Sequence, residues 1–348
     1  MCIDPRSRGA YAGHGRRRGR RRPLPATTTV AGVEGSLMST IAFIGLGHMG
    51  APMSAHLVAA GHTVHGVDLN PAAAAAAAER GVQIVSSVAE ALDGADAAIT
   101  SLPKPEHVRG VYGGIDGILA HAAPSTLLLD TSTVDVETSR WCHAGAQQCG
   151  LSFVDAPISG GTAGAEARTL TFMLGGGAAD VERAREVVAP MAGNVIACGE
   201  AGAGIAAKLV NNMMLFISVM AVSEGSQLAE QLGLDPQVFW DVARVSSADS
   251  WALRTWYPVP GIVEKAAANK NFDATFSVEL ARKDCALAVR AGDDTGVHLP
   301  AARLALGQLD DLIAEGLGGK DCTLVARFAS PDGTLRGYDP SRDGASAA

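Results

Sequence analysis

One lysine and two amides share a face of an expected helix in the second half of the chain. In "GAGIAAKLVNNMML", Lys208, Asn211 and Asn212 are spaced i, i+3 and i+4. The side chains around them are nearly all apolar. An amine kept out of water has a lowered pKa and can act as a general base or acid near neutral pH. A lysine that snorkels to the surface, or one held in an ion pair, is the structural alternative.

A glycine-rich turn near the start carries a second chemical signature. "IAFIGLGHMG" sets three glycines in a G-x-G-x-x-G pattern, directly after an expected strand and at the start of a helix, where backbone N–H groups receive a pyrophosphate. Asp68 ends the next expected strand about 20 residues on, where a carboxylate binds the ribose 2′-hydroxyl and repels a 2′-phosphate. A structural turn beside a surface aspartate is the alternative. The pattern predicts NAD rather than NADP, held by Gly45, Leu46, Gly47, His48, Met49, Gly50 and Asp68.

A third candidate site lies in "DAPISGG", which ends an expected strand at the mouth of the sheet. Glycines let a ligand approach the backbone, so the Ser159 hydroxyl and the N–H groups of Gly160 and Gly161 would form a cradle for a carboxylate. A plain turn at the exit of the strand is the alternative.

The elements that must position these residues alternate in the first half of the chain. Short buried strands such as "TIAFIGLG" and "STLLLDTS" are separated by segments of helical period, which predicts a doubly wound parallel sheet. Beyond residue 201 every strong pattern is helical, beginning with a helix of about 30 residues that Gly233 ends. We therefore expect a Rossmann-type α/β domain over 39–201, an all-helical domain over 202–330 and a loose tail over 331–348.

The first 38 residues form a basic leader. They hold eight arginines against Asp4 and Glu34, whereas the remainder carries a net charge of −14. The leader is expected to be disordered, and a nucleic-acid-binding arm or a transit peptide is one interpretation of it. The other is that translation starts at Met38, directly before the first strand. The acidic remainder disfavours nucleic acid as a partner of the folded body.

Composition indicates roughly two domains with ordinary cores, from 348 residues that are 47% hydrophobic and 18% charged. The longest apolar stretch is interrupted by Lys208 and both asparagines, so it predicts a helix buried in protein rather than a membrane span. Six scattered cysteines without a C-x-x-C spacing predict a reducing, cytoplasmic setting with neither disulfides nor a metal. The long helix has more apolar surface than one small domain can bury by itself, which favours a homodimer or homotetramer.

Taken together, four blocks resemble the β-hydroxyacid dehydrogenase family. They are "GLGHMGAPMSAHLVAAGH", "DAPISGGTAGAEARTLTFMLGG", "GAGIAAKLVNN" and "ARKDCALA", in order over residues 39–330. The resemblance, with "SSADSWALRTWYPVPG", implies NAD-dependent oxidation of 3-hydroxyisobutyrate to methylmalonate semialdehyde in valine breakdown. A relative acting on tartronate, succinic or glyoxylic semialdehyde is the alternative within the family. A non-catalytic protein that binds nucleotides or nucleic acid is the alternative outside it.

The resemblance also implies roles for single residues. The catalytic lysine falls on Lys208, the loop for the substrate carboxylate on Ser159, Gly160 and Gly161, and further substrate contacts on Asn212 and Lys283. Cofactor contacts fall on Leu102, Pro103, Thr133 and Lys283. Lys283 follows Glu279 at i+4, so a helical salt bridge is its alternative. Two positions depart from the family: Arg168 stands where relatives have a glycine, and His107 where they often have an asparagine.

Overall fold

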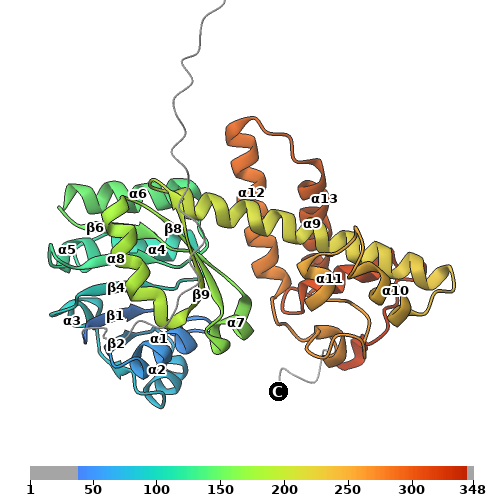
Figure 1. The fold of residues 1–348 in the computed structure, drawn as a ribbon, viewed down its shortest axis with the longest axis horizontal. Coiled ribbons are helices and arrows are strands. Elements are labelled where there is room, and N and C mark those ends of the chain that lie inside the picture. The colour runs from blue at the N-terminus through green and yellow to red at the C-terminus, as the bar shows by residue number, and fades with distance from the viewer. Residues whose placement is uncertain (1–37, 343–348) are drawn as a thin grey trace, which may run out of the picture.

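A computed structural model describes residues 38–342 and shows two bodies joined by one long helix (Figure 1). The first body is a sheet covered by helices on both faces, and the second is helical. The basic leader and the alternative start at Met38 concern residues 1–37, which lie outside the described residues, as do residues 343–348.

The sheet of the first body has nine strands in the order β3-β2-β1-β4-β5-β6-β8-β7, with β9 paired to β8. Strands β1 to β6 run parallel, as the sequence predicts, and the doubly wound α/β class is confirmed. Strand β8 instead runs antiparallel to β6 and β7. The connection over residues 160–169 is too short for a parallel crossover, which needs about a dozen residues. The strands are β1 Thr40–Ile44, β2 Thr63–Val67, β3 Gln83–Ile84, β4 Ala97–Thr100, β5 Leu127–Asp130, β6 Ser152–Asp155, β7 Ile158–Ser159, β8 Leu170–Gly175 and β9 Ala192–Gly199.

Both faces of the sheet are buried, which explains its continuous apolar strands. Ile41 and Phe43 of β1 point into one core, and Ala42 and Ile44 into the other. The covering helices are α1 Gly50–Ala59, α2 Pro71–Ala78, α3 Val88–Leu92, α4 Pro105–Tyr112, α5 Ile118–His121, α6 Val136–Gln148, α7 Gly161–Ala167 and α8 Ala178–Val188, the last followed by the 3-10 turn Ala189–Met191.

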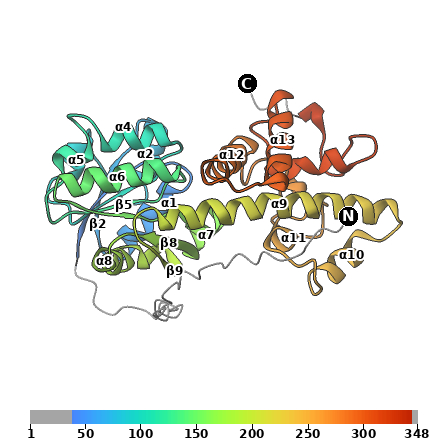
Figure 2. The same cartoon turned by 90° about the horizontal axis from the view of Figure 1, so that it is seen from above.

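Helix α9, Ala203–Gln231, runs from the edge of the sheet through the helical body (Figure 2). Its 29 residues and the left-handed Gly233 after it agree with the sequence prediction. By length and apolar composition it is the one helix in the described part of the chain that could cross a membrane, but 44% of its apolar window is buried inside the structure. The helical body adds α10 Pro236–Ala243, α11 Trp251–Thr255, α12 Val278–Thr295, α13 Pro300–Ala314 and the 3-10 segments Ala267–Lys270, Cys322–Ala329 and Pro340–Arg342.

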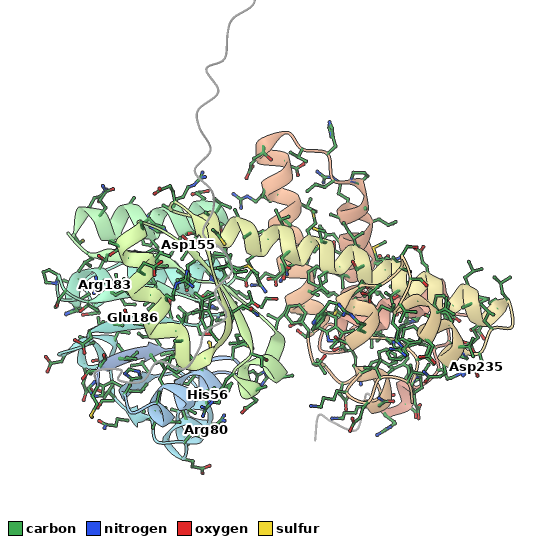
Figure 3. The ribbon with its side chains drawn as sticks, viewed as in Figure 1. His56, Arg80, Asp155, Arg183, Glu186 and Asp235 are labelled. Atoms are coloured by element: carbon green, nitrogen blue, oxygen red, sulfur yellow. The ribbon has the colours of Figure 1, made fainter. Side chains whose placement is uncertain are left out.

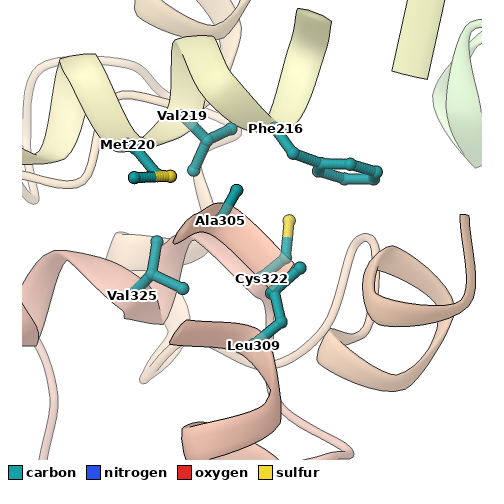
Figure 4. Close-up of a pocket in the computed structure, with 7 residues that line it drawn as sticks. All are labelled: Phe216, Val219, Met220, Ala305, Leu309, Cys322 and Val325. Atoms are coloured by element: carbon teal, nitrogen blue, oxygen red, sulfur yellow. The ribbon is translucent and has the colours of Figure 1, made fainter. Parts of the chain in front are cut away.

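A small hollow between α9, α13 and the segment after residue 322 lies in the core of the helical body (Figure 4). Phe216, Met220 and Leu309 are among its lining residues, and the Cys322 thiol is its one titratable group. Burial raises the pKa of Cys322 well above its usual value, so the thiol stays protonated and unreactive. The hollow is therefore a packing gap and not a candidate active site.

Residues 331–342 differ from the loose tail that the sequence predicts. Leu335 is buried in the core of the helical body. The Asn271 amide donates to the carbonyl of Asp339, and the Asp339 N–H donates back to the Asn271 side-chain oxygen. Arg336 pairs with Glu230 of α9. These contacts are long-range, so the polar local composition gives no sign of them.

Candidate active site

The glycine turn after β1 has the geometry that a dinucleotide requires. Gly45 is left-handed, with φ 96°, and a Cβ there would lie 2.3 Å from the Ser101 carbonyl oxygen. A Cβ at Gly50 would lie 1.9 Å from the Gly45 carbonyl oxygen. Both positions therefore need glycine to close the turn. Gly47 has nothing within 4 Å of its Cβ position, which leaves its backbone open to a pyrophosphate. The turn fits NAD.

Asp68 lies directly after β2 and is tied to this turn. One carboxylate oxygen accepts the Leu46 N–H at 2.6 Å, and the other accepts the Asn70 N–H at 2.7 Å. An ionised carboxylate offers about four acceptor positions, so capacity remains for ribose hydroxyls. Asp68 thus both shapes the glycine turn and presents negative charge beside it.

The loops after β4 and β5 form a second wall at the same edge of the sheet. The Leu102 N–H donates to the Ser132 hydroxyl oxygen at 2.9 Å, and the Ser132 hydroxyl donates to Asp130 at 2.6 Å. Pro103 and Thr133 follow these two residues along their loops. Asp130 and Ser132 escaped prediction, although a polar "DTS" directly after the buried "LLL" was their signal.

The predicted carboxylate cradle lies between β7 and α7. Gly160 and Gly161 both have positive φ, 137° and 63°, so this strand exit needs two glycines in succession. Ser159 is the last residue of β7 and lies next to them. Gly161 is exposed and has nothing within 4 Å of its Cβ position, so its backbone is open to a ligand. The carboxylate role of this cradle stays a prediction.

The far end of α7 explains how the chain accommodates Arg168. This residue keeps a left-handed conformation, with φ 59°, which favours glycine. Its guanidinium Nε donates to His56 Nδ1 at 3.0 Å, and His56 Nε2 donates to the Ala165 carbonyl at 2.9 Å. His56 belongs to α1, the helix that begins at the glycine turn (Figure 3). Arg168 therefore preserves the turn and fixes α7 to α1.

Lys208 is buried on α9 and is 8% exposed. Burial lowers its pKa from 10.5 to about 8; the Asp284 carboxylate opposes the shift and the Lys283 ammonium reinforces it. A snorkelling lysine would be exposed, so that alternative does not hold. The amine can gain or lose a proton near neutral pH, which general acid–base chemistry requires.

The two asparagines that follow Lys208 lie in different environments. Asn212 is buried, and its amide donates to Asp284 of α12 at 2.7 Å. Asn211 is exposed and donates to the Asn212 side-chain oxygen at 3.1 Å. Asn212 therefore shares the interior face with Lys208, whereas Asn211 lies at its margin.

Lys283 of α12 reaches across to the first body. Its amine donates to the Thr133 carbonyl at 2.8 Å and pairs with Asp284 at 3.0 Å. Within the described part of the chain, Lys283 therefore forms its ion pair with Asp284 and not with Glu279. Asp284 joins Lys283 to Asn212 and lies near Lys208, yet sequence reasoning missed it, although it adjoins Lys283 in "ARKDCALA".

Two further positions in segments that the sequence singled out differ in exposure. His107, which stands where relatives often have an asparagine, is exposed on α4. Tyr257, in the "RTWYPVPG" segment, is fully buried in the core of the helical body. Over residues 38–342 no group of three His, Cys, Asp or Glu side chains is placed to hold a metal ion.

Comparison with known proteins covers both bodies. Residues 40–199 match the family described as the NAD binding domain of 6-phosphogluconate dehydrogenase. Residues 202–329 match the family described as NAD-binding of NADP-dependent 3-hydroxyisobutyrate dehydrogenase.

Individual relatives agree with these matches. A probable 3-hydroxyisobutyrate dehydrogenase of Mycobacterium tuberculosis is 49% identical over 76% of this chain and 88% of its own length. An NAD-dependent L-serine dehydrogenase of Pseudomonas aeruginosa is 40% identical over 84% of this chain and 99% of its own. A solved structure titled as the M. tuberculosis 3-hydroxyisobutyrate dehydrogenase with L-serine superposes with a TM-score of 0.78 at 46% identity, over 84% of this chain and 99% of the other.

Proposed function

Because this chain belongs to the 3-hydroxyisobutyrate dehydrogenase family of NAD-dependent oxidoreductases, we propose that it oxidises 3-hydroxyisobutyrate to methylmalonate semialdehyde, as in valine breakdown. The observation that carries this proposal is the Lys208 amine, buried beside Asn212 and Asp284 with a pKa of about 8. A desolvated amine with that pKa is suited to take the proton of an alcohol.

In this proposal Lys208 acts as the general base. Its neutral amine removes the hydroxyl proton of the substrate, and in the reverse direction the ammonium returns a proton to the developing alkoxide. NAD, when bound, supplies the hydride acceptor. Asp284 holds the Asn212 amide, so that the other polar atoms of Asn212 can orient the hydroxyl next to Lys208. Burial of all three side chains keeps water away from the transferred proton.

The substrate carboxylate is assigned to the cradle of Ser159, Gly160 and Gly161. Hydroxyl and backbone N–H donors stabilise an anion, and the Lys283 ammonium adds positive charge on the α12 side. Thr133, whose carbonyl binds Lys283, lies in a loop assigned to the cofactor together with Leu102 and Pro103. A small hydroxy acid has a hydroxyl group for the Lys208 base and a carboxylate for this cradle.

L-Serine is the second candidate substrate, because one relative is named for it and one similar structure contains it. L-Serine and 3-hydroxyisobutyrate share a primary alcohol and a carboxylate, and they differ at the central carbon, where an ammonium replaces a methyl group. The Lys283 ammonium beside the site disfavours a further positive charge on the substrate, so 3-hydroxyisobutyrate is preferred.

The test is substrate profiling with NAD. Both enantiomers of 3-hydroxyisobutyrate, L-serine, glycerate and 4-hydroxybutyrate are compared by kcat/KM. The proposal expects one enantiomer of 3-hydroxyisobutyrate to exceed the others by at least about tenfold. A higher value for glycerate or 4-hydroxybutyrate contradicts it and favours a tartronate or succinic semialdehyde enzyme.

We also propose a homodimer or homotetramer that forms through the helical body. Apolar side chains remain exposed on α9, directly after it and on α10, and they include Leu228, Leu232, Val238 and Val242. Clustered exposed apolar residues favour association. Light scattering on the purified protein measures its stoichiometry, and a monomer at micromolar concentration overturns this part. The cytoplasmic location stays a prediction.

A further inference from the structure

Two buried aspartates end neighbouring strands of the sheet. Asp130 is the last residue of β5 and Asp155 the last of β6, and the parallel register pairs them directly. They are 3% and 2% exposed. A buried carboxylate is costly unless hydrogen bonds satisfy it, so the partners of each show what it holds in place.

The partners of Asp155 belong to the start of α9. Its Oδ1 accepts the Gly202 N–H at 2.9 Å, and its Oδ2 accepts the Ile205 N–H at 2.8 Å. His143 donates to Oδ1 at 2.7 Å. Asp155 thus binds the free N–H groups of the first turn and places negative charge at a helix N-terminus (Figure 3).

The Lys208 side chain is expected to lie over that same first turn. Long side chains in helices point back toward the N-terminus, so the Lys208 stem covers the turn that contains Gly204 and Ile205. A Cβ at Gly204 would lie 2.2 Å from the Met173 carbonyl oxygen, which shows how closely this turn contacts β8. The position of the amine therefore depends on the turn that Asp155 fixes.

The partners of Asp130 belong to the other wall of the site. Thr100 Oγ1, the Ser132 hydroxyl and the Ser132 N–H all donate to Oδ1 of Asp130, at 2.7, 2.6 and 3.1 Å. Ser132 in turn accepts the Leu102 N–H. Burial raises the pKa of Asp130, with a small contribution from the neighbouring Asp155 charge. Asp130 supports the loops that are assigned to the cofactor.

We propose that these paired aspartates are positioning residues with separate tasks: Asp155 places the Lys208 amine, and Asp130 places the loops that bind NAD. The inference rests on the proposed function, because it assigns the amine to proton transfer. Neither carboxylate touches the substrate in this scheme. Each acts through the backbone or hydroxyl groups that it binds.

The two carboxylates differ in a way that an amide substitution can detect. Asp130 makes its three contacts through a single oxygen, so Asp130→Asn retains an acceptor for all of them, whereas Asp130→Ala retains none. Asp155 uses both oxygens, so Asp155→Asn loses one helix N–H acceptor and the negative charge. Asparagine should therefore restore function at position 130 but not at position 155.

The experiment measures kcat, KM and the NAD dissociation constant of the full-length variants, the last by fluorescence without substrate. Asp155→Asn is expected to lower kcat about ten- to a hundredfold, as expected for a misplaced catalytic group, with NAD affinity within about twofold. Asp130→Ala is expected to weaken NAD binding about tenfold with a smaller change in kcat, and Asp130→Asn to resemble the wild type.

Asp321→Asn is the matched control, since Asp321 is a fully buried aspartate of the helical body that binds Thr275, Phe276 and Thr323. It should lower the melting temperature while kcat and NAD affinity of the folded protein stay within about twofold. If Asp155→Asn and Asp130→Ala behave like this control, or if both lower kcat and NAD affinity together, the division of tasks is overturned.

A failure of the proposed function can be distinguished from a failure of this inference about Asp130 and Asp155. A wild-type protein that turns over no hydroxy acid of the panel contradicts the proposed function, yet NAD affinity still tests Asp130. For Asp155 the rate of acetic anhydride labelling of Lys208 against pH then replaces kcat, read by mass spectrometry. A labelling profile that Asp155→Asn leaves unchanged contradicts the inference, and a displaced profile supports it.

Discussion

The Asn212 amide of α9 donates a 2.7 Å hydrogen bond to the Asp284 carboxylate of α12. The same carboxylate pairs with Lys283, which binds the Thr133 carbonyl of the first body. One buried anion thus organises the residues assigned to the substrate and links them to a loop assigned to the cofactor. Its negative charge also acts on Lys208, where it raises the pKa against the larger lowering caused by burial.

Asn212→Ala is expected to lower kcat/KM by about ten- to a hundredfold, because it removes the amide that orients the hydroxyl and leaves Oδ2 of Asp284 without its donor. Asn211→Ala is the matched control on the exposed side of the same turn and should cost less than about threefold. Steady-state kinetics of the two variants gives the comparison. Equal losses at both positions contradict the assignment of Asn212.

Oxidation should depend on pH through the Lys208 amine. The pKa of Lys208 is lowered to about 8, and the base must be neutral, so the oxidation rate should rise through this pH and level off above it. Reduction of the aldehyde needs the ammonium and should decline over the same range. Profiles of kcat/KM in both directions test this expectation, and two profiles of the same sign would rule it out.

Asp68→Ala should relax the preference for NAD over NADP by about tenfold or more, because the carboxylate that repels a 2′-phosphate is removed. Affinity for both cofactors should also fall, since the Leu46 and Asn70 N–H groups lose their acceptor. The ratio of kcat/KM for the two cofactors is the measurement. An unchanged ratio removes the ribose role of Asp68.

Arg168 provides a stability test of the turn after α7. Arg168→Gly loses the bond to His56 but relieves a left-handed conformation that costs about 1 kcal/mol, so the two effects should nearly cancel. Arg168→Ala loses the bond and keeps the strain, so it should be less stable than the glycine variant by about 1 kcal/mol. Urea unfolding of both variants measures the difference, and an alanine variant at least as stable as the glycine one contradicts the explanation.

Local sequence patterns predicted those parts of the molecule whose structure depends on residues close together in the sequence. Gly45 and Gly50 were identifiable because a tight turn between strand and helix needs glycine at fixed spacing, and Gly47 because a pyrophosphate needs an open backbone between them. Lys208 was identifiable because one charge in an apolar helix conflicts with its surroundings. The long helix and its end at Gly233 follow from hydrophobic content and a single stop signal.

The contacts that complete the site depend on residues far apart in the sequence, which local pattern does not encode. Asp155 binds N–H groups about 50 positions later, and Asp284 binds an amide more than 70 positions earlier. Asp155 ends a strand, and Asp284 follows Arg282 and Lys283 within a helix, so neither local sequence indicates the distant partner. The antiparallel β8 was likewise hidden, because pairing direction depends on the length of the connection and not on strand composition.

The most direct test of the account is Lys208→Ala, with turnover and NAD binding measured on the same preparation. Removing the general base should lower kcat by about two to four powers of ten, while the NAD dissociation constant from fluorescence stays within about twofold of the wild type. A Lys208→Ala protein that retains its turnover, or that loses turnover and NAD binding together, would show that the buried amine supports the fold rather than the proton transfer.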